Sequence, residues 1–288
     1  MIDFSNEFLG IIQKPADGTR PSRTTSPGSG VSFVLGGSNV EGAYTQILDG
    51  STEWPAGFGD GFVFMLQFAN TNLTTFANPG LATIGIDLAG GTTYTEWIHD
   101  LICGPTSNHE DASIIYRLPI RVPNGASLAV KAQCLDATPP SNPDVLFRIL
   151  GKPTRPELVR AGSFVRTFGA VTATSEGTGI TPGTTSEGAY VELGTLADDI
   201  WGWEFGMTIN NTVVSSNIHN VDIAIGDATN KRRVLRNERI GSTTSEAVIK
   251  QQPGFDFGSG LSGDKVYGRS QSEIATTGAS LIVYGIGG

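Results

Sequence analysis

The sequence predicts an all-β protein made of two tandem antiparallel β-sandwich domains of the jelly-roll type, with an extended N-terminal arm. Three observations lead to this prediction. Gly occurs 38 times and only 16% of the 288 residues are charged, and short apolar runs alternate with turn residues, which is typical of many short strands. No run shows the 3.6-residue period of a helix. The tetrapeptide EGAY occurs at residues 41–44 and again at 187–190, which points to an internal duplication.

The first copy contains eight candidate strands. Each is an alternating or continuous apolar run, and turn signals such as DG, NPG, AGG and PNG separate the runs. Eight short strands at this spacing fit an antiparallel jelly-roll sandwich, and a barrel of another topology is the alternative. The strands are expected at residues 31–35, 43–49, 61–69, 82–88, 97–102, 113–122, 127–135 and 145–150.

A four-residue repeat can arise by chance in a chain of this length, so the stretches that follow each copy decide the matter. Their order never breaks, and the spacing changes only between strands, where insertions are tolerated. The sequence therefore predicts two copies of one domain at 31–151 and 163–288, with a linker at 152–162 and an extra strand at 163–171. The matching stretches are 43–48 with 189–194, 61–72 with 202–212, 82–87 with 221–227, 97–104 with 234–241, 130–134 with 267–272, and 146–151 with 281–285.

Residues 1–30 form the predicted arm, because the stretch PADGTRPSRTTSPGSG is rich in Pro, Ser, Thr and Gly. Two interpretations of its apolar residues remain open: they pack on their own domain, or they bind a neighbouring subunit. The first residues, MIDFSNEFLGIIQKP, do not have the basic and then apolar pattern of a secretory signal peptide, so none is expected. The apolar residues of the arm are Phe4, Phe8, Leu9, Ile11 and Ile12.

Composition and motifs argue against several function classes. The net charge of −9 argues against a general nucleic-acid binder, and no apolar run approaches the roughly 18 residues of a membrane-spanning helix. Neither the three histidines nor the two cysteines have the spacing of metal ligands. Cys103 and Cys134 are expected to be buried free thiols that match Ile240 and Ser272 in the second copy. We therefore expect no cofactor, no metal, no membrane and no nucleic-acid partner.

Acid pairs beside tryptophans are the remaining pattern that is compatible with an enzyme. Asp198–Asp199 precede IWGWEF, and Glu53 precedes Trp54 at a similar place in the first copy. Two carboxylates beside aromatic rings can form a glycosidase site or a sugar platform, but a charged turn before a core strand is the simpler explanation. Trp54 and Trp201 are the candidates for stacking on a glycan, whereas Trp203 is expected in the core.

A run of basic residues stands out against the acidic background. It follows the turn GDATN and comprises Lys231, Arg232, Arg233, Arg236 and Arg239. One interpretation is a solvated sheet edge, where basic side chains discourage pairing with another chain. The other is a contact for an acidic partner surface, including another copy of this acidic protein.

The stretch YRLPIRVPNGASLAVKAQC at residues 116–134 resembles a pattern in structural proteins of tailed bacteriophages, where an LP-x-x-IP-x-G-(S/T) turn precedes the terminal strands. The second copy keeps the turn and the return strand but lacks Leu-Pro and Val-Pro. The resemblance implies a virion protein of the decoration, head-spike or fibre type, assembled in the host cytoplasm. It favours a homotrimer with other virion proteins as partners, and it assigns no catalytic residue.

The sequence thus predicts a non-enzymatic structural protein on the surface of a bacteriophage particle, in the capsid, a head spike, or a tail fibre or baseplate, acting by protein–protein assembly. The alternative is a carbohydrate-binding or host-receptor-recognition module, which would use the same fold with exposed aromatic rings. A glycan-degrading enzyme would need facing carboxylates in a groove.

Overall fold

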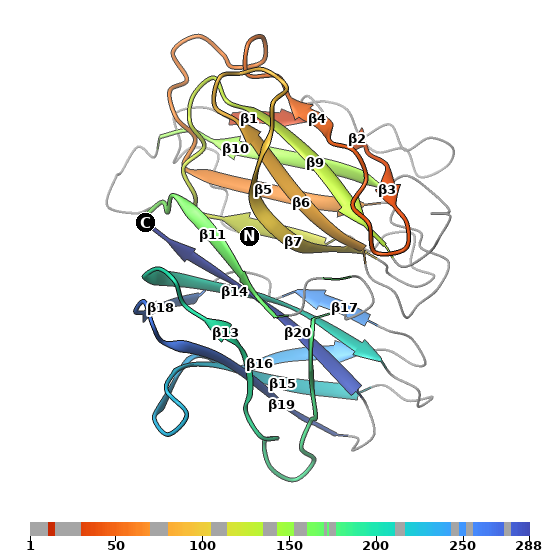
Figure 1. Cartoon of the computed structure of the whole chain (residues 1–288), viewed down its shortest axis with the longest axis vertical. Helices are drawn as coiled ribbons and strands as arrows, with labels where there is room; N and C mark the ends of the chain where they lie inside the picture. The colour runs from red at the N-terminus through yellow and green to blue at the C-terminus, as the bar shows by residue number, and fades with distance from the viewer. Residues whose placement is uncertain are drawn as a thin grey trace.

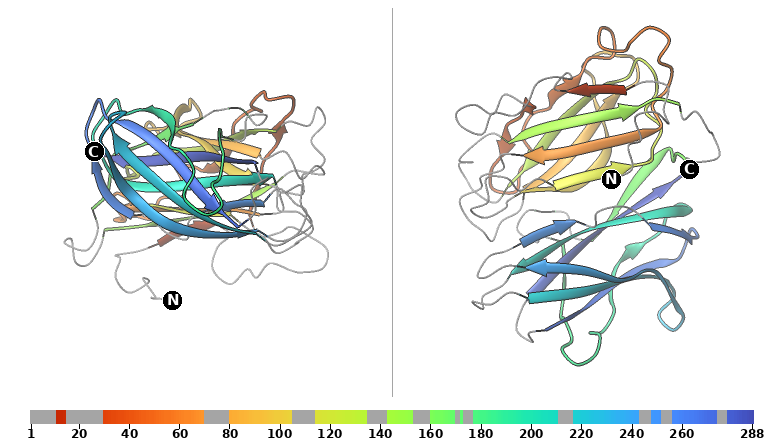
Figure 2. Two further views of the ribbon diagram at one scale, coloured as in Figure 1. Left: turned by 90° about the horizontal axis from the view of Figure 1, so that it is seen from below. Right: turned by 180° about the vertical axis from the view of Figure 1, so that it is seen from behind.

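Every regular element in the described residues of the computed structural model is a β-strand, so the all-β prediction is confirmed (Figure 1). The strands form two sandwiches stacked along the long axis of the molecule, which we call domain 1 (β1–β10) and domain 2 (β11–β20) (Figures 1 and 2). The structure describes residues 11–14, 30–69, 80–104, 114–134, 143–152, 160–169, 172, 177–210, 217–242, 248–251, 256–273 and 278–288.

Domain 1 has the strand order of a jelly roll. One sheet runs β1-β10-β5-β8 with β2 also on β10, and the other runs β3-β9-β6-β7 with β4 also on β9. Chain neighbours such as β5 and β6 lie in opposite sheets, as the jelly roll requires. The strands are β1 Ile11–Lys14, β2 Val31–Ser32, β3 Leu35–Gly36, β4 Thr45–Leu48, β5 Val63–Ala69, β6 Gly80–Asp87, β7 Thr95–Gly104, β8 Ile114–Leu118, β9 Ser127–Gln133 and β10 Asp144–Leu150.

Domain 2 repeats this topology, which confirms the duplication. Its sheets run β11-β20-β14-β17, with β12 on β20 and β18 on β14, and β13-β19-β15-β16. Strands β4 to β7 therefore match β13 to β16, β9 matches β19 and β10 matches β20. The strands are β11 Phe164–Phe168, β12 Thr178–Ile180, β13 Val191–Thr195, β14 Ile200–Asn210, β15 Asn217–Gly226, β16 Lys231–Ser242, β17 Val248–Gln251, β18 Asp256–Gly260, β19 Lys265–Ser272 and β20 Gly278–Gly287.

The predicted arm differs from the structure in one respect, because part of it is a strand of domain 1. β1 pairs antiparallel with the end of β10, with Ile12 opposite Ile149. The Ile12 side chain is 8% exposed and belongs to the domain core, so this residue packs on its own domain. β11 takes the same place on β20 in domain 2, which confirms the predicted extra strand. Phe4, Phe8 and Leu9 lie outside the described residues.

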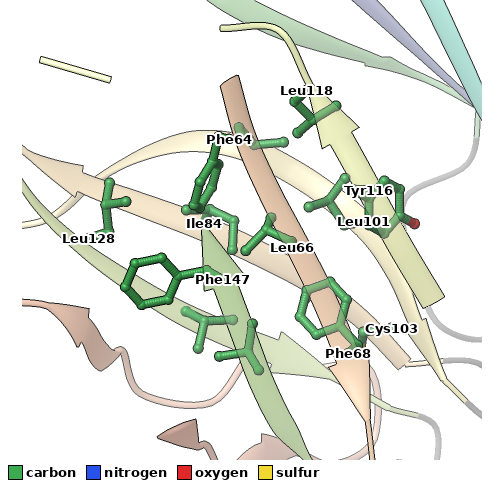
Figure 3. Packing of buried hydrophobic residues seen from close by; sticks show 14 of the residues in the cluster. Phe64, Leu66, Phe68, Ile84, Leu101, Cys103, Tyr116, Leu118, Leu128 and Phe147 are labelled. Atoms are coloured by element: carbon green, nitrogen blue, oxygen red, sulfur yellow. The ribbon is translucent and has the colours of Figure 1, made fainter. Parts of the chain in front are cut away.

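The core of domain 1 is built from alternating apolar residues on the facing sides of its two sheets. Phe64, Leu66 and Phe68 alternate along β5, and their side chains are at most 1% exposed. Phe64 and Leu66 point toward Ile84 of the opposite sheet, and Phe68 lies beside Cys103 of that sheet (Figure 3). The period of two therefore sends every second residue of β5 into the core, as the alternation in the sequence predicts.

The two sandwiches share one hydrophobic cluster, because β20 buries both of its faces. Leu281 and Val283 point into the core of domain 2, whereas Ile282, Tyr284 and Ile286 belong to the cluster that contains the core of domain 1. β11 lies beside β7 (Figure 1), and the Tyr284 side chain of β20 reaches the β7 backbone. A strand buried on both faces needs the nearly continuous apolar run SLIVYGIG that the sequence has there.

The Tyr284 hydroxyl provides the polar part of this joint. It accepts a hydrogen bond from Ile102 N–H at 3.1 Å and donates one to the Asp100 carbonyl at 2.9 Å. The Tyr116 hydroxyl donates to the Ile102 carbonyl at 2.9 Å, and the rings of Tyr116 and Tyr284 meet edge to face at 5.6 Å. Backbone groups on the β7 edge are thus bonded by a side chain of the other domain, which stabilises the contact.

We predict that Tyr284→Phe lowers the free energy of unfolding by about 1–3 kcal/mol, because it leaves Ile102 N–H and the Asp100 carbonyl buried without partners. The measurement is the urea midpoint at constant slope. Tyr267→Phe is the matched control, since the buried Tyr267 hydroxyl has no hydrogen-bond partner among the described residues. Equal midpoints for the two variants would contradict the role given to Tyr284.

Candidate functional site

The repeated EGAY stretches build equivalent clusters on the outer faces of the two sandwiches. In domain 1, the Lys131 ammonium on β9 forms ion pairs with Glu41 and, at 2.5 Å, with Glu96. The ammonium also lies 5.0 Å from the centroid of the Tyr44 ring. These ion pairs outweigh the desolvation of the ammonium and raise the pKa of Lys131, so the group stays charged.

In domain 2 the same positions are filled by Glu187, Tyr190 and Arg269. The Arg269 guanidinium pairs with Glu187, donates two hydrogen bonds to Asp222 at 2.7 and 3.0 Å, and lies 4.2 Å from the Tyr190 ring centroid. Burial opposes ionisation of Asp222, but Asn237 N–H and Arg269 outweigh it and hold the pKa of Asp222 below its ordinary value. We call the two groups of residues cluster 1 and cluster 2.

The glycine of each EGAY stretch is required by close backbone contact. Gly42 N–H donates to the Ala132 carbonyl, and Gly188 N–H donates to the Ser270 carbonyl, both at 2.9 Å. A Cβ atom would lie 2.8 Å from the Val34 carbonyl oxygen at the first position and 2.3 Å from that of Thr181 at the second. Glu, Gly and Tyr therefore have separate structural roles, and the repeat is a remnant of the duplication.

Sequence reasoning missed the clusters, although EGAY itself was their signal. What it lacked was the pairing register, which places β9 and β19 against the EGAY loops. The two clusters also differ in charge. The strand registers of the two domains show that Glu96 of β7 and Arg233 of β16 occupy equivalent positions. Thr83 and Asp222 are equivalent in the same way. Arg233 is 3.3 Å from both Glu187 and Asp222, so cluster 2 balances two acids with two bases, while cluster 1 has one base for two acids.

Asp100 lies beside cluster 1 in a strained bulge of β7. Its φ is +57°, and Asn237, which has φ +54°, takes the same bulge position in β16. Burial, and then the negative charges of Glu41 and Glu96, raise the pKa of the Asp100 carboxyl to about 7, against the opposing effect of Lys131. The backbone carbonyl of Asp100 is the one that accepts from Tyr284, so the backbone of this residue belongs to the domain joint while its carboxyl faces cluster 1.

The two tryptophans proposed for glycan stacking have different surroundings. Trp201 is 7% exposed, belongs to the cluster shared by the two domains, and lies 4.8 Å from the Arg160 guanidinium. No open ring face is left, because the domain joint covers it, so Trp201 is a packing residue and not a stacking platform. Trp203 is fully buried, as predicted.

Trp54 is only half-buried and is held in a fixed orientation. Its indole N–H donates to the Ala126 carbonyl at 2.9 Å, and its ring meets that of Phe58 edge to face at 5.6 Å. Phe58 is also partly buried against the domain core. Trp54 thus remains a candidate for glycan stacking, with its orientation set by the fold.

The acid pairs have structural partners. Asp198 pairs with Arg166 at 2.8 Å, Asp199 accepts from Ser262 N–H at 2.9 Å, and Glu53 accepts from Asp49 N–H at 2.7 Å. These contacts fix turns, in agreement with the simpler explanation of the pattern. Among the described residues, no group of three or more His, Cys, Asp or Glu side chains is placed to hold a metal ion, and no helix is long and apolar enough to cross a membrane.

The two cysteines are buried and free, as predicted. Cys134 N–H donates to the Gly36 carbonyl and Ser272 N–H donates to the Gly183 carbonyl, both at 2.8 Å, so Cys134 and Ser272 are equivalent. Burial raises the pKa of the Cys103 thiol, which makes it a packing residue with little thiolate character.

The basic run lies along β16, the edge strand of its sheet. Arg233 belongs to cluster 2, Arg232 donates to the Ser259 carbonyl, and Lys231 donates to the Ala228 carbonyl. Arg236 and Arg239 are exposed and have no acceptor among the residues that the structure describes.

Part of the stretch that carries the bacteriophage resemblance, residues 119–122, lies at the domain joint. Arg121 N–H donates to the Gly162 carbonyl and Gly162 N–H donates to the Pro119 carbonyl, both at 2.7 Å. Gly162 directly precedes domain 2. Ile120 and Val122 between the two prolines are fully buried, so the Leu-Pro and Val-Pro stretch holds the start of domain 2 against domain 1.

No protein-family model matches the chain, and no curated protein matches its sequence. Solved structures similar to it include a fucolectin from striped bass (Morone saxatilis) serum, with 12% identity, a TM-score of 0.23 and 79% of each chain covered. The tandem CBM22 domains of Xyn10C from Paenibacillus barcinonensis show 10% identity and a TM-score of 0.26 over 98% of this chain and 95% of that chain. A chain of Sulfolobus turreted icosahedral virus shows 9% identity and a TM-score of 0.21 over 92% of this chain and 62% of that chain. TM-scores this low assign neither a function nor a site.

We predict that Asp100→Asn stabilises the protein above neutral pH. An unfolded Asp100 releases its proton near pH 3.8, whereas the folded one keeps it to about pH 7. The stability that Asp100 contributes therefore falls as pH rises between these values and is lost above the upper one. The advantage of the variant should grow by roughly 1–3 kcal/mol between about pH 5 and pH 8.

Denaturant unfolding across this pH range measures the effect. The control is Asp60→Asn: Asn124 N–H and Arg121 outweigh the effect of burial on Asp60 and lower its pKa, so this variant should lose stability at both ends of the range. An Asp100→Asn advantage that does not change with pH would contradict the raised pKa.

Proposed function

We propose that the chain is a non-enzymatic structural protein on the surface of a tailed-bacteriophage particle, as a capsid decoration, head-spike, or tail-fibre or baseplate component. The observation that carries the proposal is the position of the stretch that resembles phage structural proteins. Residues 119–122 of this stretch lie at the joint between two jelly rolls: Ile120 and Val122 are in the core, and backbone hydrogen bonds join Pro119 and Arg121 to Gly162. A motif used to hold domains in fixed relation suits a protein that acts by assembly.

The build of the molecule supports this role. Two sandwiches that share a hydrophobic cluster form a stiff body, which can transmit fixed geometry from one contact surface to another. The carboxylates Asp198, Asp199 and Glu53 fix turns, which is consistent with a function without catalysis. The partners are other virion proteins and further copies of the chain, as a homotrimer, with residues Phe4, Phe8 and Leu9 reaching a neighbour. Assembly takes place in the host cytoplasm and the protein resides in the virion.

The test is to locate the protein in purified particles. We expect it in a fixed number of copies per virion, accessible to antibody on intact particles, with two stacked lobes visible at its position by electron cryomicroscopy. Its presence only in the host lysate, with none in gradient-purified particles, would overturn the proposal.

A second candidate function is recognition of a host surface glycan, and Trp54 favours it. The bond from its indole N–H to Ala126 and the contact with Phe58 hold the ring at the domain surface, and a fixed aromatic ring loses little entropy when a sugar stacks on it. A virion surface protein can have both functions.

We predict for this second candidate that Trp54→Ala abolishes binding to host envelope polysaccharide, measured by calorimetric titration, while Trp97→Phe leaves it unchanged. Trp97 is also half-buried, and its ring stacks on Phe64 of the core. No binding by the wild-type chain, or equal binding by both variants, would exclude Trp54 as a glycan site.

A further inference from the structure

The edge strand β7 of domain 1 is a docking position within the chain. Domain 2 covers it: the His99 carbonyl accepts from the Thr167 hydroxyl at 2.7 Å, and the Asp100 carbonyl accepts from Tyr284. A Cβ atom on Gly206 would clash with Ile102 at 2.4 Å, so β14 packs closely on this edge. Apolar and backbone contacts thus bind domain 2 to the β7 edge.

The equivalent edge of domain 2 is β16, and its chemistry is different. The matched registers place Arg236 where domain 1 has His99, and Arg239 where it has Ile102. Five of the twelve residues of β16 are basic and one is acidic. The same position in the duplicated fold has therefore changed from an apolar contact to a basic one, and a further copy of domain 2 cannot dock there in the way that domain 2 docks on β7.

The exposed end of this edge presents the guanidinium groups of Arg236 and Arg239. Arg239 borders a hollow that is also lined by Asn220, Gln271 and the acidic Glu273, and the Gln271 amide donates to the Thr184 carbonyl at 3.1 Å. Arg236 and Arg239 have no acceptor among the described residues, in contrast to Arg233 in cluster 2. An exposed guanidinium can form bidentate hydrogen bonds to a carboxylate.

Domain 1 supplies the complementary charge. Residues 31–151 hold four basic and eleven acidic side chains, a net charge of −7. Glu41 and Glu96 share the one lysine Lys131 on one outer face, and His99 lies 3.6 Å from Glu96. The Glu96 side chain is 46% exposed, so it is accessible to a second molecule.

We propose that the β16 edge, through Arg236 and Arg239, binds the acidic outer face of domain 1 of a second copy of this chain. The contact is heterologous, because the edge of one copy meets a different surface of the next, and such contacts form a ring when the rotation closes. A net-acidic chain repels nucleic acid over most of its surface, which favours a protein partner. The inference rests on the proposed function, since it names a surface through which the chain assembles.

The experiment is sedimentation velocity of the full chain at increasing salt. We expect self-association at about 50 mM salt that weakens as salt screens the charges. Arg236→Glu with Arg239→Glu should weaken it roughly tenfold or more. The matched control is Arg117→Glu with Arg148→Glu, which changes the charge equally at exposed positions of β8 and β10 and should have little effect. Thermal unfolding checks that each variant folds.

A charge-swap mixture gives the sharper result. The Glu96→Lys chain should associate with the Arg236→Glu/Arg239→Glu chain more tightly than either associates with itself. The inference would be overturned if the wild-type chain is a monomer at about 100 µM, or if both double variants weaken self-association equally. It would also be overturned if the only effect of Arg236→Glu with Arg239→Glu is a loss of binding to DNA. Self-association without a place in the virion would instead contradict only the proposed function.

Discussion

The packing of β20 between the two sandwiches is the constraint on which the rest of the structure depends. Its residues Ile282, Tyr284 and Ile286 belong to the cluster of domain 1, while Ala279, Leu281 and Val283 belong to the core of domain 2. Because the Tyr284 hydroxyl bonds backbone groups of β7, the contact also has a defined orientation. The joint explains why Trp201 is buried and why domain 2 covers residues 99–102 of β7.

The two copies show what duplication kept and what it changed. Each retains a glutamate, a glycine, a tyrosine and a base that together hold the EGAY loop on the sheet. The charges around that unit diverged, with Glu96 in one copy and Arg233 in the other. As a result cluster 1 has two acids for the single base Lys131, whereas cluster 2 is balanced, and the other basic residues of domain 2 lie along β16. The two copies therefore present different charges at equivalent positions of one fold.

Local patterns predicted the fold well, because alternation and turn residues act over a few residues. The strands of the first copy, the duplication, the extra strand β11 and the buried Cys103 and Cys134 all follow from such patterns. The joint could not be predicted in this way, since it depends on register. The sequence of β20 indicates only an ordinary terminal strand, and the packing of its second face against β7 is seen only in the structure. For the same reason Trp201 looked available, and the pairing of Lys131 and Arg269 with the EGAY loops was not seen. Ile12 joined domain 1 because β10 offers an edge for β1.

The central claim is that the two jelly rolls form one cooperative body through the shared cluster. Differential scanning calorimetry of the intact chain tests it most directly, because two independent domains unfold in two steps. The account predicts a single transition with a calorimetric enthalpy close to the van't Hoff enthalpy. Two resolved transitions, or a calorimetric enthalpy about twice the van't Hoff value, would show that the sandwiches unfold independently and would contradict it.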